Sequence, residues 1–328
     1  MAVLVTGGAG YIGSHAVLDL VAAGESVVVL DDLSTGFRWA VAPEAELVVG
    51  DVGDPKLIAE LIRTRGIDAV MHFAGSVVVP ESVAKPLRYY LNNTAKSRTL
   101  IEAAVQGGVR HFVFSSTAAV YGPDVAQPVV EGAETAPATP YGRSKLMTET
   151  MLADTAAAHG LRYAALRYFN VAGSDPQLRT GHSTKGATHL IKVVAEAALG
   201  KRSYVDVFGT DWDTPDGTGV RDFIHVSDLT RAHVAALAYL RNGGRSIVAN
   251  CGYGRGYSVR EVIDTMQRLS GRSVLARDAP RRPGDLGLVV SDPSLLRATL
   301  DWAPRHDDLD FIIKTALAWE EQLGKTRL

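Results

Sequence analysis

Short apolar runs alternate along the chain with longer stretches in which apolar residues recur at helical spacing. Runs rich in Val, Ile and Phe predict buried strands, and the stretches between them predict helices that connect one strand to the next. The expected strands are residues 2–6, 26–31, 46–49, 68–74, 111–116 and 162–168, and the expected helices are residues 12–23, 54–65, 87–106 and 140–159. This alternation is typical of an α/β fold with a doubly wound parallel sheet that is covered by helices on both faces.

The regular alternation ends after residue 170, which predicts a change of architecture. Loops rich in Gly, Ser, Thr and Asp occupy residues 172–188 and 209–221, and we expect substrate contacts there. Ser258 and Glu261 form a capping box before a later helix. Further helices are expected at residues 186–199, 226–241, 293–300 and 308–323. We therefore expect a first domain of residues 1–175, which also takes in about 213–241, and a smaller α/β C-terminal substrate domain of residues 176–212 and 242–328.

Composition and charge argue against several classes of protein. Lys and Arg number 34 against 36 Asp and Glu, mixed in sign along the 328 residues, so we expect no nucleic-acid partner. No apolar run approaches the roughly 18 residues that span a bilayer, and the first residues predict a strand rather than a secretory signal. The single cysteine, Cys251, excludes an internal disulfide and is expected to be buried after a strand. These features predict a soluble, cytoplasmic protein with no membrane partner.

A glycine-rich turn, residues 6–13 (TGGAGYIG), follows the first expected strand. Its glycines fit a G-x-G-x-x-G pattern that starts at Gly8 or a G-x-x-G-x-x-G pattern that starts at Gly7. Both allow a tight turn and close approach of a pyrophosphate, as in Rossmann-like folds. Asp31 ends the second expected strand, where a carboxylate accepts hydrogen bonds from ribose hydroxyls and repels a 2′-phosphate. NAD is therefore expected rather than NADP, and Arg38, the nearest cation, is expected on the surface.

Two further strand ends indicate contacts with the same cofactor. Asp51 ends the third expected strand and serves either as a helix cap or as a contact for adenine. The fourth strand ends in Phe73-Ala74-Gly75, whose small residues let the backbone approach a ligand. His72, just before them, is expected to be a histidine of the core.

Tyr141 and Lys145 lie four residues apart within one expected helix. If Pro140 occupies the first turn of that helix, the phenol and the ammonium lie on one face, one turn apart. A cation beside a phenol favours the phenolate, so that a pKa of about 10 is lowered towards working pH and the group can accept a proton. Together with the glycine-rich turn, this pair indicates nicotinamide chemistry.

These residues resemble the extended short-chain dehydrogenase/reductase family and, within it, the UDP-glucose 4-epimerases. The segments that carry the resemblance are residues 6–15 (TGGAGYIGSH), 31–36 (DDLSTG), 114–122 (FSSTAAVYG), 141–145 (YGRSK), 167–170 (RYFN), 216–226 (DGTGVRDFIHV) and 280–285 (PRRPGD). The resemblance implies a UDP-hexose substrate and reversible inversion at C4 of the hexose in UDP-galactose and UDP-glucose. It also implies transient oxidation to a 4-keto sugar by a tightly bound NAD.

The same resemblance implies a role for each site residue. Tyr141 removes the proton of the 4-hydroxyl while hydride passes from C4 to nicotinamide. Lys145 binds the nicotinamide ribose and lowers the pKa of the phenol, and Thr117 bridges the sugar oxygen and the phenol. The implied cofactor contacts are Gly7, Gly10, Tyr11, Ile12, Gly13, Asp31, Asp51, Val52, Phe73, Ala74, Gly75, Asn92, Tyr141, Lys145 and Tyr168. The implied substrate contacts are Thr117, Asn170, His189, Leu190, Phe208, Arg221, Arg282, Asp285 and Val289.

The substrate set is chemically consistent with a nucleotide sugar. Arg221 and Arg282 offer forked donors to a diphosphate, and Phe208 can pack on uracil. In this family the helices that correspond to residues 87–106 and 140–159 pair across a two-fold axis, which implies a homodimer.

Three features of the sequence refine what the resemblance implies. Nucleotide-sugar dehydratases carry an acid where this chain has Ala118 and Ala119, and alanine cannot donate a proton, so dehydration or decarboxylation is disfavoured. Residues 76–79 (SVVV) lack the lysine that many epimerases place near the cofactor phosphates, so the resemblance does not establish how tightly NAD is held. Val289 aligns with a pocket position where a small side chain leaves room at C2 of the sugar, which predicts some turnover of N-acetyl sugars.

Two other functions stay open on sequence alone. One is another nucleotide-sugar epimerase or reductase on the same scaffold, acting on a UDP-pentose or a UDP-uronic acid. The other, of a different class, is a non-catalytic NAD-binding sensor. We expect no metal site, because the histidines show no ligand spacing and the Asp-rich residues 211–217 do not fit a calcium loop.

Overall fold

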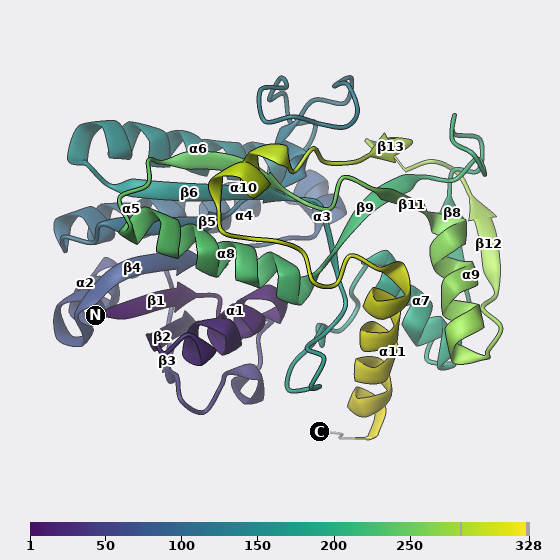
Figure 1. Cartoon of the computed structure of the whole chain (residues 1–328), viewed down its shortest axis with the longest axis horizontal. Coiled ribbons are helices and arrows are strands. Elements are labelled where there is room, and N and C mark those ends of the chain that lie inside the picture. Colours follow the sequence, from purple (N-terminus) through teal and green to yellow (C-terminus); the bar gives the residue numbers. More distant parts are fainter. Residues whose placement is uncertain (283, 326–328) are drawn as a thin grey trace.

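The computed structural model describes residues 1–282 and 284–325. Its largest element is a parallel sheet of seven strands in the order β10-β6-β5-β4-β1-β2-β3 (Figure 1). The strands are β1 (Ala2–Thr6), β2 (Ser26–Asp31), β3 (Glu46–Val49), β4 (Ile67–His72), β5 (His111–Ser115), β6 (Arg162–Tyr168) and β10 (Ile247–Cys251). The six strands expected from the apolar runs are confirmed, and the sheet is doubly wound because the strand order reverses between β1 and β4.

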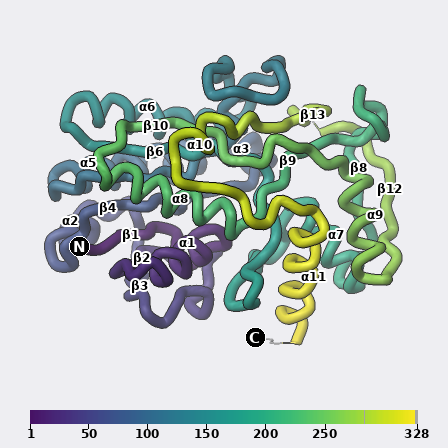
Figure 2. The backbone as a smooth tube through the Cα atoms, in the orientation of Figure 1, coloured from purple at the N-terminus to yellow at the C-terminus, as the bar shows by residue number. Residues whose placement is uncertain are grey.

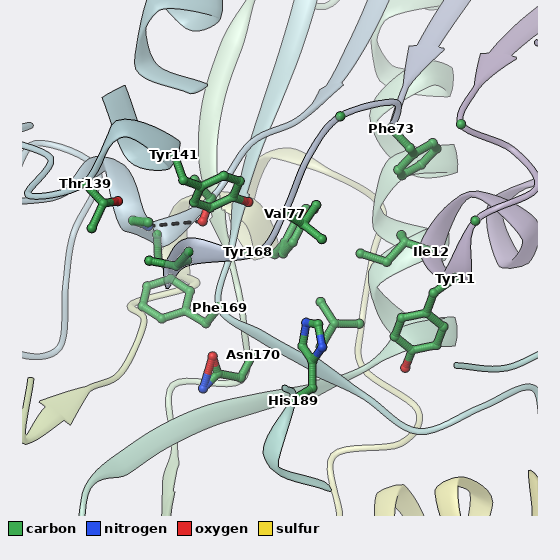
Figure 3. Close-up of a pocket in the computed structure, with 18 of the residues that line it drawn as sticks. Tyr11, Ile12, Phe73, Val77, Thr139, Tyr141, Tyr168, Phe169, Asn170 and His189 are labelled. Carbon is green, nitrogen blue, oxygen red and sulfur yellow. Dashed lines mark hydrogen bonds between the residues drawn. The ribbon is translucent and has the colours of Figure 1, made fainter. Parts of the chain in front are cut away.

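Helices cover both faces of this sheet, as the alternating pattern predicted. Helices α1 (Tyr11–Ala22) and α8 (Val226–Arg241) bury their apolar side chains against one face. Helices α2 (Pro55–Arg65), α5 (Lys96–Gln106) and α6 (Pro140–His159) bury theirs against the other. Helix α6 has the predicted bounds, with Thr139 as its N-cap and Gly160 in the left-handed region after its end. Tyr141 on its first turn lies in one group of side chains with Thr139 and Phe169 (Figure 3).

The helix expected at residues 87–106 is interrupted. The chain forms α3 (Val79–Ala84), α4 (Pro86–Tyr89), a π-helical segment η2 (Tyr90–Ala95) and only then α5. Pro86 has no N–H to donate to the preceding turn, so α4 begins there as a segment separate from α3, and the departure within the expected range is the π-helical segment. A π-helical turn often marks a functional position in a helix, and Asn92 lies in this one.

The rest of the chain forms smaller sheets and helices on the other side of the molecule (Figure 1). One sheet joins β11 (Gly256–Ser258), β9 (Val220–His225) and β13 (Leu288–Val289), with β7 (Asn170–Ala172) also on β9; the other joins β8 (Val205–Phe208) and β12 (Ala276–Ala279). The helices here are α7 (Leu190–Ala198), α9 (Val259–Ser270) and α11 (Leu309–Lys325), and α11 lies beside α7 and α9 (Figure 2). The short helix α10 (Ser294–Thr299) lies beside β10 of the main sheet. The capping box of Ser258 and Glu261 at α9 is confirmed.

Strand β10 extends the main sheet beyond what the pattern predicted. It lies within residues 242–328, which the sequence assigned to the substrate domain, yet it pairs in parallel with β6. Cys251 is the last residue of this strand rather than a residue after it, and it is fully buried. Short 3₁₀ helices also occur at η1 (Arg38–Ala40) and η3 (Ala118–Val120). Among the described residues, no helix is long and apolar enough to cross a membrane.

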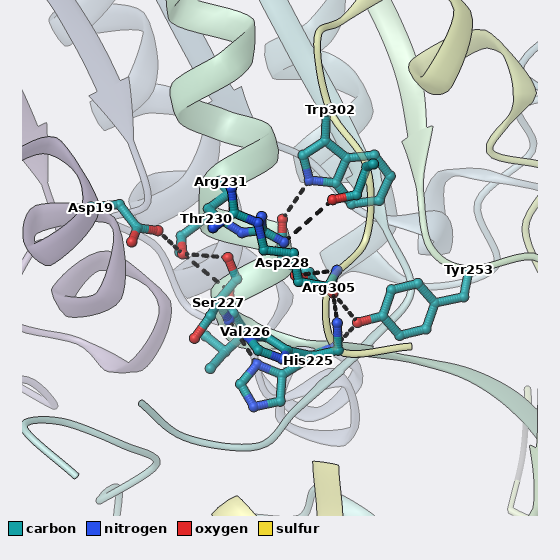
Figure 4. Close-up of polar contacts among 12 residues, drawn as sticks. Asp19, His225, Val226, Ser227, Asp228, Thr230, Arg231, Tyr253, Trp302 and Arg305 are labelled. Atoms are coloured by element: carbon teal, nitrogen blue, oxygen red, sulfur yellow. Dashed lines mark hydrogen bonds and ion pairs between the residues drawn. The ribbon is translucent and has the colours of Figure 1, made fainter. Parts of the chain in front are cut away.

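A buried carboxylate on α8 holds the last part of the chain against the main sheet (Figure 4). Asp228 accepts hydrogen bonds from the Tyr253 hydroxyl at 2.7 Å and from the backbone N–H groups of Arg305 at 3.0 Å and His306 at 2.9 Å. Trp302 Nε1 donates to the Asp228 carbonyl oxygen at 2.9 Å. Burial alone would raise the pKa of Asp228, but these hydrogen bonds outweigh it and hold the pKa below its usual value.

Replacing Asp228 with Asn should therefore destabilise the fold. The amide keeps the shape but removes the negative charge that pairs with Arg231. We expect the free energy of unfolding to fall by about 3–5 kcal/mol, as when one partner of a buried charged pair is removed, measured by urea unfolding at pH 7. The difference from the unmodified protein should shrink below about pH 4, because the lowered pKa of Asp228 stabilises the fold only while the group is ionised.

Asp278→Asn is the matched control for this substitution. Asp278 lies exposed on β12, where its only ion pair, among the described residues, is with Arg260 at 3.8 Å. Exposed pairs of this length contribute little, so its urea midpoint should be unchanged. Equal midpoints for the two variants would show that the Asp228 contacts do not stabilise the fold.

Candidate active site

One cavity of about 470 Å³ lies at the carboxyl ends of the main-sheet strands and extends to the smaller sheets (Figure 3). It begins where the strand order reverses, between β1 and β4, which is where doubly wound folds bind their ligands. Most of the sequence-predicted site residues line it: Gly7, Gly10, Tyr11, Ile12, Gly13, Asp31, Asp51, Val52, Phe73, Ala74, Gly75, Asn92, Thr117, Tyr141, Tyr168, Asn170, His189, Arg221, Asp285 and Val289. Residues that are far apart in the chain thus share one space.

The glycine-rich turn packs so closely that side chains are excluded from it. Gly7 has a φ of +73°, and a Cβ added there would lie 2.5 Å from the Ala74 nitrogen. A Cβ on Gly13 would collide with the Gly7 carbonyl oxygen. Gly7, Gly10 and Gly13 all line the cavity, so the pattern that starts at Gly7 describes the ligand side of the turn. Gly10 caps α1 without a side chain, which leaves first-turn N–H groups available to a pyrophosphate.

Asp31 is held in place by the backbone around it. One of its carboxylate oxygens accepts from Ala9 N at 2.9 Å and the other from Leu33 N at 2.8 Å. Burial raises the pKa of Asp31, and these two hydrogen bonds oppose the rise. Each oxygen keeps a second lone pair that a ribose hydroxyl could use. Arg38 is exposed, as expected.

Asp51 lies beside a lysine that the sequence did not single out. Its carboxylate is 2.6 Å from Lys96 Nζ, and both residues line the cavity. The helix-cap interpretation of Asp51 is wrong, because Asp54 caps α2 by accepting from the backbone N–H groups of its first turn. Lys96 follows Asn92 by four residues, so helical spacing could have indicated that the two share a face.

The turn after β4 is fixed by an asparagine that the sequence also missed. Asn93 is buried; its Oδ1 accepts from Ser76 N at 2.7 Å, and its Nδ2 donates to Ser76 O at 2.9 Å. A Cβ on Gly75 would lie 3.1 Å from Asn93 Oδ1, so a side chain there would disturb this contact. The predicted residue Asn92 donates from Nδ2 to Ser76 Oγ at 2.9 Å. His72 lies behind the turn and is buried in the core, as expected.

Tyr141 and Thr117 face each other in the middle of the cavity. Burial raises the pKa of the Tyr141 phenol above its usual value, and a hydrogen bond with Thr117 lowers it in part. Lys145 does not line the cavity; its Nζ donates to the Ser115 carbonyl oxygen at 2.9 Å. Burial lowers the pKa of Lys145 to about 8, opposed by Glu149. The expected lowering of the phenol pKa by Lys145 is therefore not seen, because desolvation of the phenol dominates.

A buried ion pair lies beneath this centre. Arg167 Nη2 is 2.6 Å from Glu149 Oε2, and both side chains are almost fully buried. The Arg167 guanidinium also lies 4.9 Å from the centroid of the Tyr121 ring, and Ser116 donates to Glu149. Because Glu149 is one helical turn after Lys145 and Ser116 directly precedes Thr117, the pair anchors the two segments that carry the proposed reacting groups.

The far end of the cavity carries the predicted substrate residues, with three exceptions. Phe208 and Arg282 lie outside the lining, with the Arg282 guanidinium 4.6 Å from the Phe208 ring centroid and its Nε 2.7 Å from Asp285. Leu190 begins α7 directly after His189 and also lies outside the lining. Arg221 does line the cavity, and burial lowers the pKa of its guanidinium. Pro283, part of the 280–285 segment, lies outside the described residues.

The segment of residues 123–139 covers the cavity. The sequence did not predict this position for the segment. It is joined to the residue that follows β13, since Val129 N donates to Val290 O at 2.8 Å and the Gln127 side chain accepts from Val290 N at 2.8 Å. The pairing depends on residues more than 150 positions apart, so no local pattern could show it. Cavity residues not predicted from the sequence include Lys96, Val77, Val79, Tyr121, Val125, Gln127, Val129, Thr139, His182 and Thr184. Among residues 1–282 and 284–325, no cluster of three His, Cys, Asp or Glu side chains suits a metal ion.

Comparison with known proteins gives consistent matches over the whole chain. Residues 3–252 match the NAD dependent epimerase/dehydratase family. A UDP-glucose 4-epimerase from Azospirillum brasilense is 57% identical, and the alignment covers 99% of this chain and 93% of that protein.

Two solved structures have the same fold at similar levels of identity. The UDP-glucose 4-epimerase from Brucella ovis in complex with NAD has a TM-score of 0.94 at 44% identity, with 97% of each chain covered. The UDP-glucose 4-epimerase from Stenotrophomonas maltophila, with bound NAD and formylated UDP-arabinopyranose, has a TM-score of 0.96 at 41% identity, with 99% of each chain covered. The chain thus belongs to the NAD dependent epimerase/dehydratase family, and within that family it is similar to UDP-glucose 4-epimerases.

Proposed function

We propose that this protein reversibly inverts C4 of the hexose in UDP-galactose and UDP-glucose, with NAD held in the cavity. The observation that carries the proposal is one continuous cavity that joins three groups of residues. Asp31 and the glycine-rich turn lie at one end, Thr117 and Tyr141 in the middle, and Arg221 and Asp285 at the other. The relatives named above support it, since UDP-glucose 4-epimerases share the whole chain length and two of them bind NAD in crystals.

The residues present fit NAD chemically. The open N-terminus of α1 and the side-chain-free turn would take the pyrophosphate, Asp31 the adenosine ribose, and Asp51 with Val52 the adenine end. Lys96 is the cavity-lining cation at the adenine end, because it contacts Asp51. Phe73, Ala74, Gly75, Asn92 and Tyr168 are proposed to complete the cofactor contacts. When bound there, NAD supplies a hydride acceptor and donor for C4 of the sugar.

The chain's own residues would manage the proton. Tyr141 accepts the proton of the 4-hydroxyl as the 4-keto sugar forms and returns it afterwards, so the overall reaction involves no net oxidation. Thr117 hydrogen-bonds the phenol and orients the sugar oxygen. Burial makes the phenolate costly, so positive charge near Tyr141 must offset the cost. Lys145 supplies that charge at neutral pH, because its pKa of about 8 leaves most of it protonated.

The alternatives fit the cavity less well. Ala118 and Ala119 line it after β5, and neither can expel a hydroxyl as an acid. A UDP-uronic acid would need a cation near C6, and Arg221 is the only arginine or lysine in the lining besides Lys96, as far as the described residues define it. A non-catalytic sensor would not need Thr117 and Tyr141 together in the cavity.

The division into domains is proposed along the same lines. Residues 1–175 and about 213–241 would bind NAD, and residues 176–212 and 242–328 would bind the nucleotide sugar, except that β10 belongs to the main sheet. We also propose a homodimer, by analogy with the helix pairing of the family. Large apolar side chains are exposed on the segments concerned, namely Leu87, Leu91 and Met147, and Val83 is exposed on the preceding helix α3. Such a patch on a soluble protein indicates an interface.

The proposed activity is tested with purified protein and UDP-galactose, without added NAD. We expect UDP-glucose to appear by chromatography, and protein-bound NAD to be released on denaturation. Tyr141→Phe should reduce turnover by at least about a hundredfold, the usual contribution of a general acid-base group, while the bound NAD is unchanged. Turnover by Tyr141→Phe at the unmodified rate would exclude Tyr141 as the proton acceptor.

Room beside Val289 predicts activity on N-acetyl sugars. Val289 is a small side chain that lines the substrate end of the cavity, so UDP-N-acetylglucosamine should be converted to its galacto epimer. Val289→Tyr should reduce that conversion at least about tenfold and leave turnover of UDP-galactose within about threefold, because the added ring fills only the space near C2. The two sugars are assayed in parallel, and no conversion of the N-acetyl sugar by the unmodified protein counts against this prediction.

The proposed homodimer depends on the exposed apolar patch. Leu87→Asp combined with Leu91→Asp would bury two charges in the interface, so we expect the mass measured by light scattering to fall to that of one chain. Leu275→Asp, an exposed leucine before β12 and away from this patch, serves as the control and should leave the mass unchanged. A monomeric mass for the unmodified protein would refute the dimer.

A further inference from the structure

Two loops meet at the substrate end of the cavity, and one arginine joins them. The first loop, residues 209–217, follows β8; the second, described at residues 280–282 and 284–287, precedes β13. The Arg281 guanidinium of the second loop lies 3.8 Å from the ring centroid of Trp212 in the first. Arg281 also donates from Nε to Asp211 Oδ1 at 2.8 Å and from Nη2 to Asp211 O at 2.6 Å. The guanidinium therefore uses both its face and its donors to hold the first loop.

The Trp212 ring fills the space between the loops. A Cβ on Gly287 would lie 2.9 Å from Trp212 Cε3, and a Cβ on Gly209 would meet both Trp212 and the Arg281 side chain. The ring nitrogen points to the Phe208 carbonyl oxygen at 3.5 Å. Glycines on both sides leave room for the Trp212 ring, so the thickness of the ring sets the distance between the two loops.

The second loop carries groups that face the substrate end of the cavity. Asp285 and Leu286 line it, and Gly287 O accepts from Val220 N at 2.8 Å, next to the cavity residue Arg221. Arg282 spans Phe208 and Asp285 across the junction of the loops. Loss of the contact between Arg281 and Trp212 would thus release the loop that places these groups.

We propose that Arg281 and Trp212 form a clamp that positions the nucleotide-binding loops and so sets the affinity for the nucleoside diphosphate. Neither residue lines the cavity as far as the described residues define it, so the clamp acts on substrate affinity and not on the reacting atoms. The inference rests on the proposed function for the identity of the ligand. It adds a positioning role for two residues that the site itself does not contain.

A second arginine-aromatic contact, at the sheet of β8 and β12, provides a matched control. The Arg277 guanidinium lies 3.1 Å from the Tyr204 ring centroid and donates from Nη2 to Asp206 Oδ1 at 3.0 Å. This contact has the same chemistry as the clamp, but it joins β12 to the start of β8 rather than the two loops. None of its three residues is among the cavity-lining residues within the described chain.

The clamp is tested with Arg281→Ala, Trp212→Ala, Trp212→Phe and Arg277→Ala. The Kd of UDP is measured by calorimetry, and KM and kcat are measured for UDP-galactose. Arg281→Ala and Trp212→Ala should each raise the Kd and KM about tenfold, the size expected for one cation–π contact with its hydrogen bonds. The kcat should stay within about twofold. Trp212→Phe keeps a ring face and should stay within about threefold of the unmodified Kd, and Arg277→Ala should be unchanged.

The outcomes separate the clamp from the proposed function. If the unmodified protein binds UDP but Arg281→Ala and Trp212→Ala bind it as Arg277→Ala does, the clamp is refuted and the proposed function stands. The clamp is also refuted if Trp212→Phe loses as much affinity as Trp212→Ala, or if kcat falls as far as affinity. If the unmodified protein neither binds UDP nor converts UDP-galactose, the proposed function itself is refuted.

Discussion

The cavity depends on the close approach of two backbone segments at the centre of the main sheet. The turn after β1 passes so near the end of β4 that a Cβ on Gly7 would lie 2.5 Å from the Ala74 nitrogen. This contact brings the N-terminus of α1 beside Phe73 and Gly75, at the point where the strand order reverses. Any side chain at Gly7 or Gly13 would separate these segments and remove the surface that fits a pyrophosphate.

The two ends of the cavity belong to different sheets, and strand pairing and helix packing connect them. Strand β7 carries Asn170 and pairs with β9, which carries Arg221 and continues into α8. Because α8 packs on the main sheet, the substrate end is joined to the cofactor end through continuous regular structure. Asp228 then ties the chain after residue 300 to the same helix. A ligand that reaches from Asp31 to Asp285 would therefore meet a preformed site.

Burial, more than direct contact between charged groups, sets the pKa values of the side chains at the centre of the site. Tyr141 and Lys145 are one turn apart, but the ammonium donates to the Ser115 carbonyl oxygen and burial raises the pKa of the phenol. Glu149, one turn further along, favours the charged form of Lys145 against its own desolvation. Arg167 in turn neutralises Glu149. These alternating charges favour the protonated form of Lys145, one helical turn from a phenol whose pKa is raised by burial.

Sequence alone determined the features that depend on local chemistry. Apolar periodicity located six strands and α6, the capping box located α9, and the glycine-rich turn with Asp31 and Tyr141 indicated a nicotinamide site. These succeed because helix caps, strand periods and glycine turns are specified within a few residues.

Tertiary structure decided what depends on distant partners. It added β10 to the main sheet, made residues 90–95 of the expected helix π-helical, and placed Lys96 at the cavity. It also placed Asn93 against the turn after β4 and folded residues 123–139 over the cavity. It also reversed the expected shift in the pKa of Tyr141. Each of these results reflects burial or pairing between segments far apart in the chain, and burial is a property of the packed molecule that no short stretch of sequence contains.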